Sequence, residues 1–397
     1  MGKRKNTVQK KKILFVYYTM MLGGSTTSLL SLLDKFDYEK YDVDLLLYKN
    51  EGPYIDYIPQ QVNLLPQACV IKRKPMQALK SVIDFSYAKA LFRTFKYIKR
   101  FRLTRQTASY LQLSFSRKLK KRYDVAIGFL ELWSDVYVNE CVKADKKISW
   151  VHVDYEKAHF IPDIDRKMFS KSDCIVHVSE ECKKNFEISF PELKNKCYCV
   201  ENILTKQFIQ KRTSNVKSVS VELDKTFLNL LSVCRLDIDS KGLDRGVDII
   251  KRLKEIGLFV KWYIVGDGPD REKLISQIKS SGLDNDILLL GAMECPYSIF
   301  KYFDAFFLPS RFEGKPMAVT EALMLGLPPI VAKYSSVEEQ IKNEIDGIIT
   351  KNDDDSIYEC LVKVCENRTL LEKIRENISV SNYDNVDCIE KIYKLLD

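Results

Sequence analysis

Short apolar runs alternate with stretches of helical periodicity along most of the chain. Runs of Val, Ile, Leu and aromatic residues between polar or glycine-containing turns are typical of strands buried on both faces of a parallel sheet. The stretches between them repeat apolar residues at helical spacing. This order predicts an α/β fold with two doubly wound, Rossmann-like parallel sheets that face each other across a cleft. The predicted strands are residues 12–18, 41–48, 124–130, 147–153, 173–178 and 197–203 in the first half, and 227–233, 262–265, 287–290, 305–308, 329–332 and 347–350 in the second.

The polar stretch 205–225 has no periodicity and is predicted to link the two sheets. We therefore expect an N-terminal domain (residues 1–204) and a C-terminal domain (205–375). The remaining segment, 376–397, contains an amphipathic pattern from Asp387 onward and is predicted to pack back on the N-terminal domain.

Composition excludes several classes of protein. The 397 residues are 46% hydrophobic and 29% charged, as in soluble globular proteins. No stretch approaches the roughly 18 apolar residues of a membrane span, and the charged N-terminus leads into a strand rather than a signal peptide. The eleven cysteines form no CxxC pair and indicate reduced thiols in a cytoplasm. The three histidines lack metal-ligand spacing, so we expect no metal site.

Positive charge is concentrated in one segment. The net charge is +9, yet from Lys72 to Arg122 there are sixteen Lys or Arg residues and one acid, Asp84. Within this segment, apolar and aromatic residues between Leu79 and Ile98 follow helical spacing, which is typical of a basic amphipathic helix on an anionic membrane surface. Nucleic acid would attract the same charge. A helix packed on its own domain with a solvated basic face is the third interpretation.

The most informative motif joins the strand 305–308 to a helical pattern that ends at Gly326. Pro316 suits the first helical position, and a helix start at a strand end binds phosphate through free N–H groups and the helix dipole. Glu313 precedes this point and Glu321 lies inside the helix. Retaining glycosidases hold two carboxyl groups about 5 Å apart, whereas Pro316 to Glu321 alone spans roughly 7 Å of helix rise. The pair is better suited to grip two parts of one long ligand, although two solvated glutamates remain the simpler alternative.

Other strand ends carry candidate chemistry. Gly23-Gly24 follows the first strand and lets a backbone approach a phosphate closely. Arg235 and Lys241 share a loop after strand 227–233 and together can clamp a diphosphate, although singly each is an ordinary surface cation. His152 ends the strand 147–153, with Asp154 two positions later. Asp237-Ile238-Asp239 is the nearest approach to a metal-binding Asp-x-Asp motif.

Taken together, these motifs resemble the retaining glycosyltransferase family 4, whose members have the two-domain GT-B fold. The resemblance spans nearly the whole chain and is closest in the second half. It rests on elements that occur in the family's order: Gly23-Gly24, His152, Ser179, Arg235 with Lys241-Gly242, Gly266-Asp267-Gly268-Pro269, Pro309-Ser310, and Glu313 followed after seven residues by Glu321.

The resemblance implies a role for each matching position. Arg235 and Lys241 would stabilise the leaving diphosphate, and Glu321 would bind the ribose. Glu313 would bind the transferred sugar, and His152 would lie beside the sugar or the reaction centre. Four of these would be catalytic, namely His152, Arg235, Lys241 and Glu313. The donor-binding set would be Gly23, Gly24, Arg235, Lys241, Gly266, Glu313, Gly314, Lys315, Pro316, Met317, Ala318, Val319 and Glu321. The family needs neither a cofactor nor a metal, because the leaving phosphate is thought to receive the acceptor proton.

The resemblance also implies an activity and a location. We expect transfer of a sugar from a nucleotide-sugar, of UDP type, to a glycan acceptor that is lipid-linked, in bacterial capsule, exopolysaccharide or O-antigen synthesis. The N-terminal domain would bind the acceptor and the C-terminal domain the donor. The enzyme would be cytoplasmic and peripheral on the inner face of the cell membrane, docked through the basic segment.

Three alternatives stay open. A degenerate transferase could act as a non-catalytic partner of another transferase. A hydrolysing nucleotide-sugar 2-epimerase shares the two-sheet architecture, but it depends on histidines and carboxylates in both domains. A transferase that modifies nucleic acid would bind it with steep salt dependence; we predict that nucleic acid is not a partner.

Overall fold

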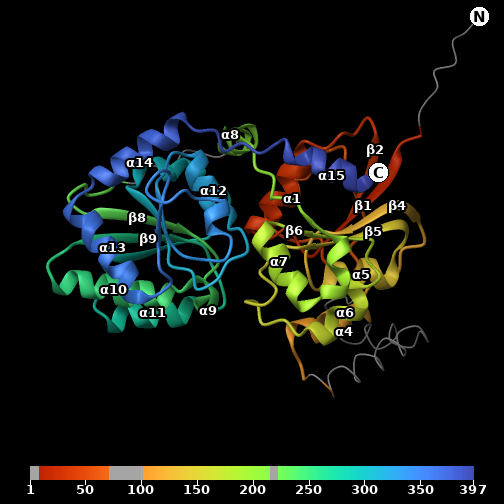
Figure 1. The fold of residues 1–397 in the computed structure, drawn as a ribbon, viewed down its shortest axis with the longest axis horizontal. Coiled ribbons are helices and arrows are strands. Elements are labelled where there is room, and N and C mark those ends of the chain that lie inside the picture. The colour runs from red at the N-terminus through yellow and green to blue at the C-terminus, as the bar shows by residue number, and fades with distance from the viewer. Residues whose placement is uncertain (1–8, 71–99, 101, 215–221) are drawn as a thin grey trace, which may run out of the picture. The chain divides into compact units, whose positions relative to one another are not determined.

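A computed structural model describes residues 9–70, 100, 102–214 and 222–397 (Figure 1). These residues form two compact units. The first comprises the described parts of Met1–Met21, Leu32–Glu201 and Asp387–Asp397, and the second comprises Leu22–Ser31 and the described part of Asn202–Val386. The second unit thus includes thirteen residues of the expected N-terminal domain, namely Leu22–Ser31 and 202–204, and helix α1 (Gly24–Asp34) is divided between the units.

The first unit is built on a seven-stranded sheet of order β3-β2-β1-β4-β5-β6-β7. All of its neighbouring strands are parallel, with Phe15 of β1 opposite both Leu45 and Ile127. The predicted strands are all present, and the sequence missed only β3, whose two residues are too few for a period to appear. The strands are β1 (Lys11–Tyr17), β2 (Tyr41–Leu47), β3 (Asn63–Leu64), β4 (Arg122–Gly128), β5 (Lys143–Val151), β6 (Cys174–His177) and β7 (Cys197–Cys199).

Helices cover this sheet and bury large aromatic side chains against it (Figure 1). Phe186 meets Phe169 and Tyr155 edge to face, with ring centroids 5.0 and 5.5 Å apart, an arrangement that adds to the stabilisation from burial. Ser179, part of the family pattern, caps the helix that carries Phe186 by accepting a hydrogen bond from the Cys182 N–H. The described helices are η1 (Ile55–Tyr57), α4 (Arg105–Leu113), α5 (Trp133–Cys141), α6 (Pro162–Phe169), α7 (Glu180–Ser189) and η2 (Pro191–Lys196).

The terminal helix α15 (Cys388–Leu396) belongs to the first unit, far from it in sequence. The Tyr393 ring stacks on Tyr41 at 5.6 Å and meets Phe36 edge to face. Its hydroxyl accepts a hydrogen bond from the Asp37 N–H at 2.8 Å. The apolar face of this amphipathic helix is therefore buried against residues that follow the first strand.

The second unit is built on a six-stranded parallel sheet of order β10-β9-β8-β11-β12-β13. All six of its strands were predicted. They are β8 (Leu228–Val233), β9 (Val260–Val265), β10 (Ile287–Gly291), β11 (Ala305–Leu308), β12 (Pro329–Ala332) and β13 (Ile348–Thr350). The carboxyl ends of β8 and β11, which are neighbours in the sheet, carry the loops with Lys241 and Glu313. The prediction that both halves are doubly wound parallel sheets is confirmed.

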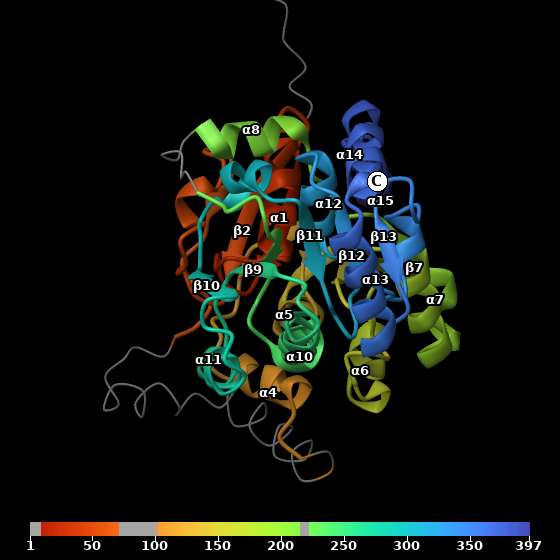
Figure 2. The ribbon, with the colours of Figure 1, turned by 90° about the vertical axis from the view of Figure 1, so that its left-hand side faces the viewer.

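Helices α10, α11 and α13 lie side by side in this unit (Figure 2). Arg252 of α10, for example, places its guanidinium 4.1 Å from the centre of the Tyr358 ring of α13. The helices of the second unit are α8 (Lys206–Ser214), α9 (Ile238–Lys241), α10 (Leu243–Glu255), α11 (Arg271–Ser280), η3 (Pro296–Tyr302), α12 (Met317–Met324), η4 (Val337–Glu339), α13 (Asp354–Glu366) and α14 (Thr369–Val380).

The expected linker 205–225 is not patternless, because its first half forms α8. Phe208, Ile209 and Arg212 of this helix are buried. With so few inward-facing positions, the sequence of this helix resembles that of a polar loop, and its periodicity was therefore missed.

The basic segment from Lys72 to Arg122 is described only in part. The amphipathic helix predicted between Leu79 and Ile98 lies outside the described residues. The described part of the segment contains α4 and the first residue of β4. Among the described residues, no helix has the length and apolar character needed to cross a bilayer.

Candidate functional site

The loop between β11 and α12 forms the centre of the site in the second unit. Strand β11 is entirely buried, and Pro309 and Ser310 continue its burial into the loop. Helix α12 begins at Met317, so Pro316 is its N-cap rather than its first residue as predicted; proline cannot donate, and its fixed φ suits either position. Gly326 follows the helix with φ +76°, which is the left-handed conformation of a C-terminal cap.

Lys241 and Glu313, predicted to bind different parts of a ligand, form an ion pair. The Lys241 Nζ donates to Glu313 Oε1 at 2.6 Å, and the Ser310 hydroxyl donates to the same oxygen at 2.7 Å. The side chains of the pair are only 20% and 9% exposed. Burial alone would lower the pKa of Lys241, but the charge and hydrogen bond of Glu313 outweigh it and raise that pKa. The ammonium therefore stays charged at neutral pH and can bind a second anion.

Gly266 allows the neighbouring strand end to approach this pair. It has φ +147°, and a Cβ there would lie 1.8 Å from the Cys234 carbonyl oxygen. A side chain would therefore push apart the ends of β8 and β9. Arg235 follows Cys234 and is exposed. The loop thus presents one exposed and one paired cation.

The Asp237-Ile238-Asp239 motif has a structural role. The Asp237 side chain accepts a hydrogen bond from the Ser240 N–H and caps α9, which ends at Lys241. Within the described parts of the chain, no group of three or more His, Cys, Asp or Glu residues is placed to hold a metal.

Glu321, the second glutamate, lies in a different environment. It is 6% exposed, and the Tyr297 hydroxyl donates to its Oε1 at 3.2 Å. Burial raises the pKa of this carboxyl to about 7, although Tyr297 and the charge of Arg212 act in the opposite direction. A buried carboxylate near its pKa at neutral pH is poorly satisfied by the protein alone and is suited to accept hydrogen bonds from a ligand.

The N-terminus of α12 lies between the two glutamates. The Val319 N–H already bonds to the Pro316 carbonyl oxygen at 3.2 Å, so the predicted anion-binding role falls to the N–H groups of Met317 and Ala318. On the other side of the loop, Ser336 donates to the Gly314 carbonyl. Gln340 donates to the Pro316 carbonyl at 2.9 Å and to Thr320. The segment that includes Lys315 is thus held on both sides of that residue.

Gly24, the first residue of α1, lies against this helix start within the second unit. A Cβ at Gly24 would approach the Met317 Cβ to 3.1 Å, whereas one at Gly23 would meet nothing within 4 Å. Packing therefore favours glycine at position 24 and places no such restriction on position 23.

His152, the remaining candidate, belongs to the first unit. Its backbone N–H donates to Glu131 Oε2 at 3.0 Å, and its ring stacks on Trp150 at 6.2 Å between centroids. Burial raises the pKa of Glu131, and the next residue, Leu132, has φ +72°. Such strained backbone recurs at functional sites. Asp154, by contrast, is occupied by the Lys157 N–H and the Asn185 amide.

Sequence reasoning missed three residues that contact the candidates: Glu131, Tyr297 and Ser310 as a donor to Glu313. Glu131 directly follows a predicted strand, and a search of every strand end would have found it. Tyr297 carries no comparable signal, because it lies 24 positions from Glu321.

Comparison with known proteins places this geometry in context. Residues 215–380 match the family Glycosyl transferases group 1. This match contains the Lys241–Glu313 pair and Glu321, and it leaves His152 outside.

Two curated relatives are glycosyltransferases. An uncharacterized glycosyltransferase of Methanocaldococcus jannaschii is 26% identical over 269 residues, which cover 58% of this chain and 64% of that protein. The Escherichia coli UDP-Gal:alpha-D-GlcNAc-diphosphoundecaprenol alpha-1,3-galactosyltransferase is 36% identical over 140 residues, 33% of this chain and 35% of that enzyme. The matches therefore span less than two thirds of the length of these relatives.

The fold is shared over a longer span. The crystal structure of Anabaena HepE in complex with UDP-glucose matches 97% of this chain and 99% of that one, with a TM-score of 0.69 and 16% identity. At this identity the likeness concerns the fold. The predicted GT-B class of two parallel-sheet α/β domains is confirmed.

Proposed function

We propose that the protein is a retaining glycosyltransferase that moves a sugar from a UDP-sugar to a lipid-linked glycan acceptor. The observation that carries this proposal is the distribution of charge around the start of α12. A cation–carboxylate pair lies before the helix start and a buried carboxylate lies inside the helix, so diphosphate, sugar and ribose each have a chemically matching site.

In this proposal the diphosphate binds between the glutamates. The N–H groups of Met317 and Ala318 and the α12 dipole favour its negative charge. Lys241 and the exposed Arg235 offset the charge that develops on the leaving phosphate. Glu321 accepts hydrogen bonds from the ribose hydroxyls in addition to the one that Tyr297 donates.

Glu313 performs a second task in the same arrangement. It orients Lys241 by its ion pair and accepts a hydroxyl of the transferred sugar with the rest of its carboxylate. The acceptor oxygen attacks the anomeric carbon on the side of the leaving group. The bond from that carbon to the phosphate oxygen breaks, the new glycosidic bond forms, and the leaving diphosphate receives the acceptor proton. No enzyme nucleophile, cofactor or metal enters the proposed step.

The donor and acceptor classes are supported by relatives. The E. coli relative is named for a UDP-galactose donor and a diphosphoundecaprenol-linked acceptor, and HepE was crystallised with UDP-glucose. We extend this chemistry to bacterial surface-polysaccharide synthesis, with the first unit binding the acceptor and His152 beside the reaction centre. The basic segment from Lys72 to Arg122 would dock the enzyme on the anionic inner face of the cell membrane, since each cation near such a surface contributes about 1 kcal/mol.

The burial of His177 disfavours the epimerase alternative. His177 is fully buried in β6, and burial lowers its pKa to about 3, so it stays neutral at physiological pH. That leaves two of the three histidines of the chain for acid–base chemistry. A non-catalytic role is disfavoured by the intact Lys241–Glu313 pair.

The decisive test supplies UDP-glucose, UDP-galactose and UDP-N-acetylglucosamine separately to the purified protein with bacterial lipid-linked acceptors. We expect one labelled sugar to enter the lipid fraction with its anomeric configuration retained, as determined by NMR of the product. Product of inverted configuration, or binding of none of these nucleotides, would refute the proposal.

The proposed docking on the membrane is tested by a separate variant. Replacing Lys96, Lys99, Arg100, Arg102 and Arg105 by Gln should abolish sedimentation with phosphatidylglycerol vesicles and reduce transfer to a lipid-linked acceptor. Transfer to a short soluble acceptor and UDP binding should be preserved. Vesicle binding that survives at physiological salt would place the membrane contact elsewhere.

A further inference from the structure

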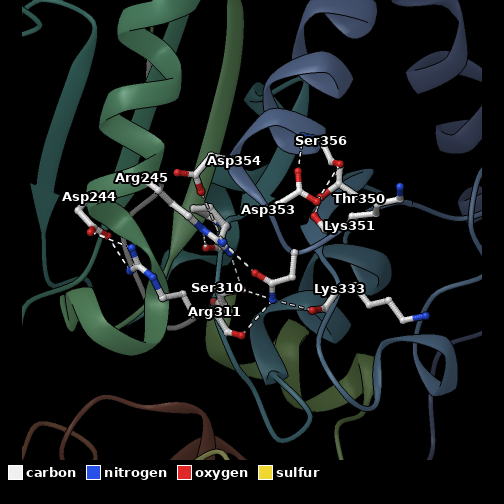
Figure 3. A network of polar contacts seen from close by, with 12 residues as sticks. Asp244, Arg245, Ser310, Arg311, Lys333, Thr350, Lys351, Asp353, Asp354 and Ser356 are labelled. Carbon is white, nitrogen blue, oxygen red and sulfur yellow. Dashed lines mark hydrogen bonds and ion pairs between the residues drawn. The ribbon is translucent and has the colours of Figure 1, made fainter.

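One buried guanidinium holds the loop that carries Glu313. Arg245, in α10, is 5% exposed. Its Nε donates to the Pro309 carbonyl and one terminal nitrogen donates to the Ser310 carbonyl, both at 2.8 Å (Figure 3). The other terminal nitrogen donates to Asn352 Oδ1 at 2.8 Å. All three sides of the guanidinium are therefore occupied, two of them by consecutive carbonyl groups of one loop.

Asn352 extends this grip to neighbouring strands. Its Nδ2 lies 3.2 Å from the Ser310 carbonyl oxygen, 3.0 Å from that of Arg311 and 2.7 Å from that of Lys333. Lys333 directly follows β12, and Asn352 follows β13. Arg245 and Asn352 together thus tie the loop to the ends of two adjacent strands. Figure 3 labels Arg245, Ser310 and Lys333 of this network.

Ser310 connects this network to the candidate site. Its carbonyl oxygen accepts from Arg245, while its hydroxyl donates to Glu313 Oε1 at 2.7 Å, the same oxygen that pairs with Lys241. The turn that follows Lys241 is positioned by the same loop. A Cβ at Gly242 would lie 2.1 Å from the Pro309 carbonyl oxygen, so the turn after Lys241 packs directly on the carbonyl that Arg245 holds.

Stability alone is a poor reason for this arrangement. Burying a guanidinium is costly, and an apolar side chain of similar size often replaces a buried charge without loss of stability. Arg245 forms an ion pair with Asp354, but at 3.8 Å and with an Asp354 side chain that is 57% exposed. What an apolar side chain would not provide is directed hydrogen bonding to two successive carbonyl groups, which fixes where the Ser310 hydroxyl and the Glu313 carboxylate lie.

We propose that Arg245 is a positioning residue that sets the Glu313 carboxylate for recognition of the transferred sugar. This inference rests on the proposed function, in which Glu313 contacts the sugar and Glu321 the nucleoside. Arg245 acts on the sugar end of the site, so its loss should reduce recognition of the sugar and leave recognition of UDP intact.

The test compares Arg245→Lys with Arg252→Lys, which lies in the same helix but binds Asp355 and the Tyr358 ring, away from the loop. Calorimetry with UDP and with UDP-glucose, UDP-galactose and UDP-N-acetylglucosamine gives the affinity of each nucleotide-sugar relative to UDP. For the sugar that wild type prefers, we expect this ratio to fall at least fivefold in Arg245→Lys, with UDP affinity within twofold. The transfer kcat should fall at least tenfold. Arg252→Lys should match wild type throughout.

A double variant separates positioning from general loss of structure. In a Glu313→Ala background, Arg245→Lys should cause no further change in the affinity ratio, because the group it positions is gone. An unchanged ratio in Arg245→Lys, or an equal further loss in the Glu313→Ala background, would overturn the inference.

Two remaining outcomes are also decisive. If Arg245→Lys fails to fold, Asn352→Ser removes the amide contacts to the same loop and should lower the ratio in the same way; an unchanged ratio there would overturn the inference. Wild-type protein that binds none of the nucleotides would refute the proposed function itself. Nucleotide binding without a response to Arg245→Lys would refute only the role of Arg245.

Discussion

The two glutamates at either side of the α12 start show how differently one residue type is held within a single site. Glu313, in the loop, is neutralised by Lys241 and also accepts from Ser310. Glu321, inside the helix, has a neutral donor, Tyr297, and burial raises its pKa to about 7. The loop end is thus electrically balanced before a ligand arrives, whereas the helix end is not. At Glu313, a ligand must compete with the hydrogen bonds from Lys241 and Ser310. At Glu321, it adds hydrogen bonds that the protein does not supply.

The largest loss of transfer activity should come from breaking the Lys241–Glu313 ion pair. Lys241→Met removes the cation that pairs with Glu313 and one of the charges that offset the leaving phosphate. We expect transfer to lose at least about 2–4 kcal/mol of transition-state stabilisation. The melting temperature should also fall, because the carboxylate stays largely buried without its cation.

Two comparisons sharpen this prediction. Glu313→Gln in the Lys241→Met background should restore the melting temperature without restoring transfer. Arg235→Met, at an exposed cation, should reduce transfer and leave the melting temperature unchanged. Transfer by Lys241→Met at near-normal rates would show that the phosphate is held elsewhere.

The unbalanced end should reveal itself in the pH dependence of stability. Between its ordinary pKa of 4.5 and the folded value of about 7, Glu321 is ionised in the unfolded chain but protonated in the folded one. The folded state therefore binds more protons, and stability falls as pH rises through this window, by about 1.4 kcal/mol per unit of pKa shift. Chemical denaturation should show Glu321→Gln gaining stability relative to wild type from pH 5 to pH 7.5, by about 2–2.5 kcal/mol. A constant difference between the two proteins would contradict the raised pKa.

Nucleotide affinity should separate the glutamates more modestly. Glu321→Gln should weaken UDP binding about tenfold at pH 8, since one good charge-assisted hydrogen bond is worth about 1.5–3 kcal/mol. Wild-type affinity should rise with pH through 7 as Glu321 ionises, whereas the variant should show no such rise. Glu313→Ala should keep UDP affinity within twofold and yet abolish transfer. Equal losses of UDP affinity in both variants, measured by calorimetry, would contradict the assignment of ribose to one and sugar to the other.

The smallest expected effect is that of chelation. With Lys241, Arg235 and the α12 start offsetting the diphosphate, EDTA should change the transfer rate by less than about twofold. Loss of activity in EDTA that Mg²⁺ or Mn²⁺ restores would show that a metal contributes to the chemical step.

The sequence predicted the strands well because their signal is local. Twelve of the thirteen strands in the described residues were placed from apolar runs bounded by turns, and β3 was missed because two residues show no period. The same reasoning placed Lys241 and Glu313 each after the carboxyl end of a strand, and the structure shows that these strands, β8 and β11, are neighbours in the sheet. It assigned the two residues to different parts of one ligand and missed their ion pair, because that pair depends on side-chain directions that the sequence pattern does not specify.

Contacts between distant positions account for most of what was missed. Arg245 looks like any charged residue on an amphipathic helix, and its partners lie 64, 65 and 107 positions away. Tyr297 likewise gives no sign that it will meet Glu321. Such residues are chosen by the three-dimensional packing of loops, for which the sequence carries no periodic signal.

The close approach of Gly24 to Met317 implies a constraint that should be visible across evolution. A Cβ at position 24 would come within 3.1 Å of the Met317 side chain, so the helix start tolerates a larger residue at 24 only if residue 317 becomes smaller. The two positions, nearly three hundred residues apart, should therefore covary among homologous sequences. Laboratory selection starting from Gly24→Ala should recover function through Met317→Ala or Met317→Ser.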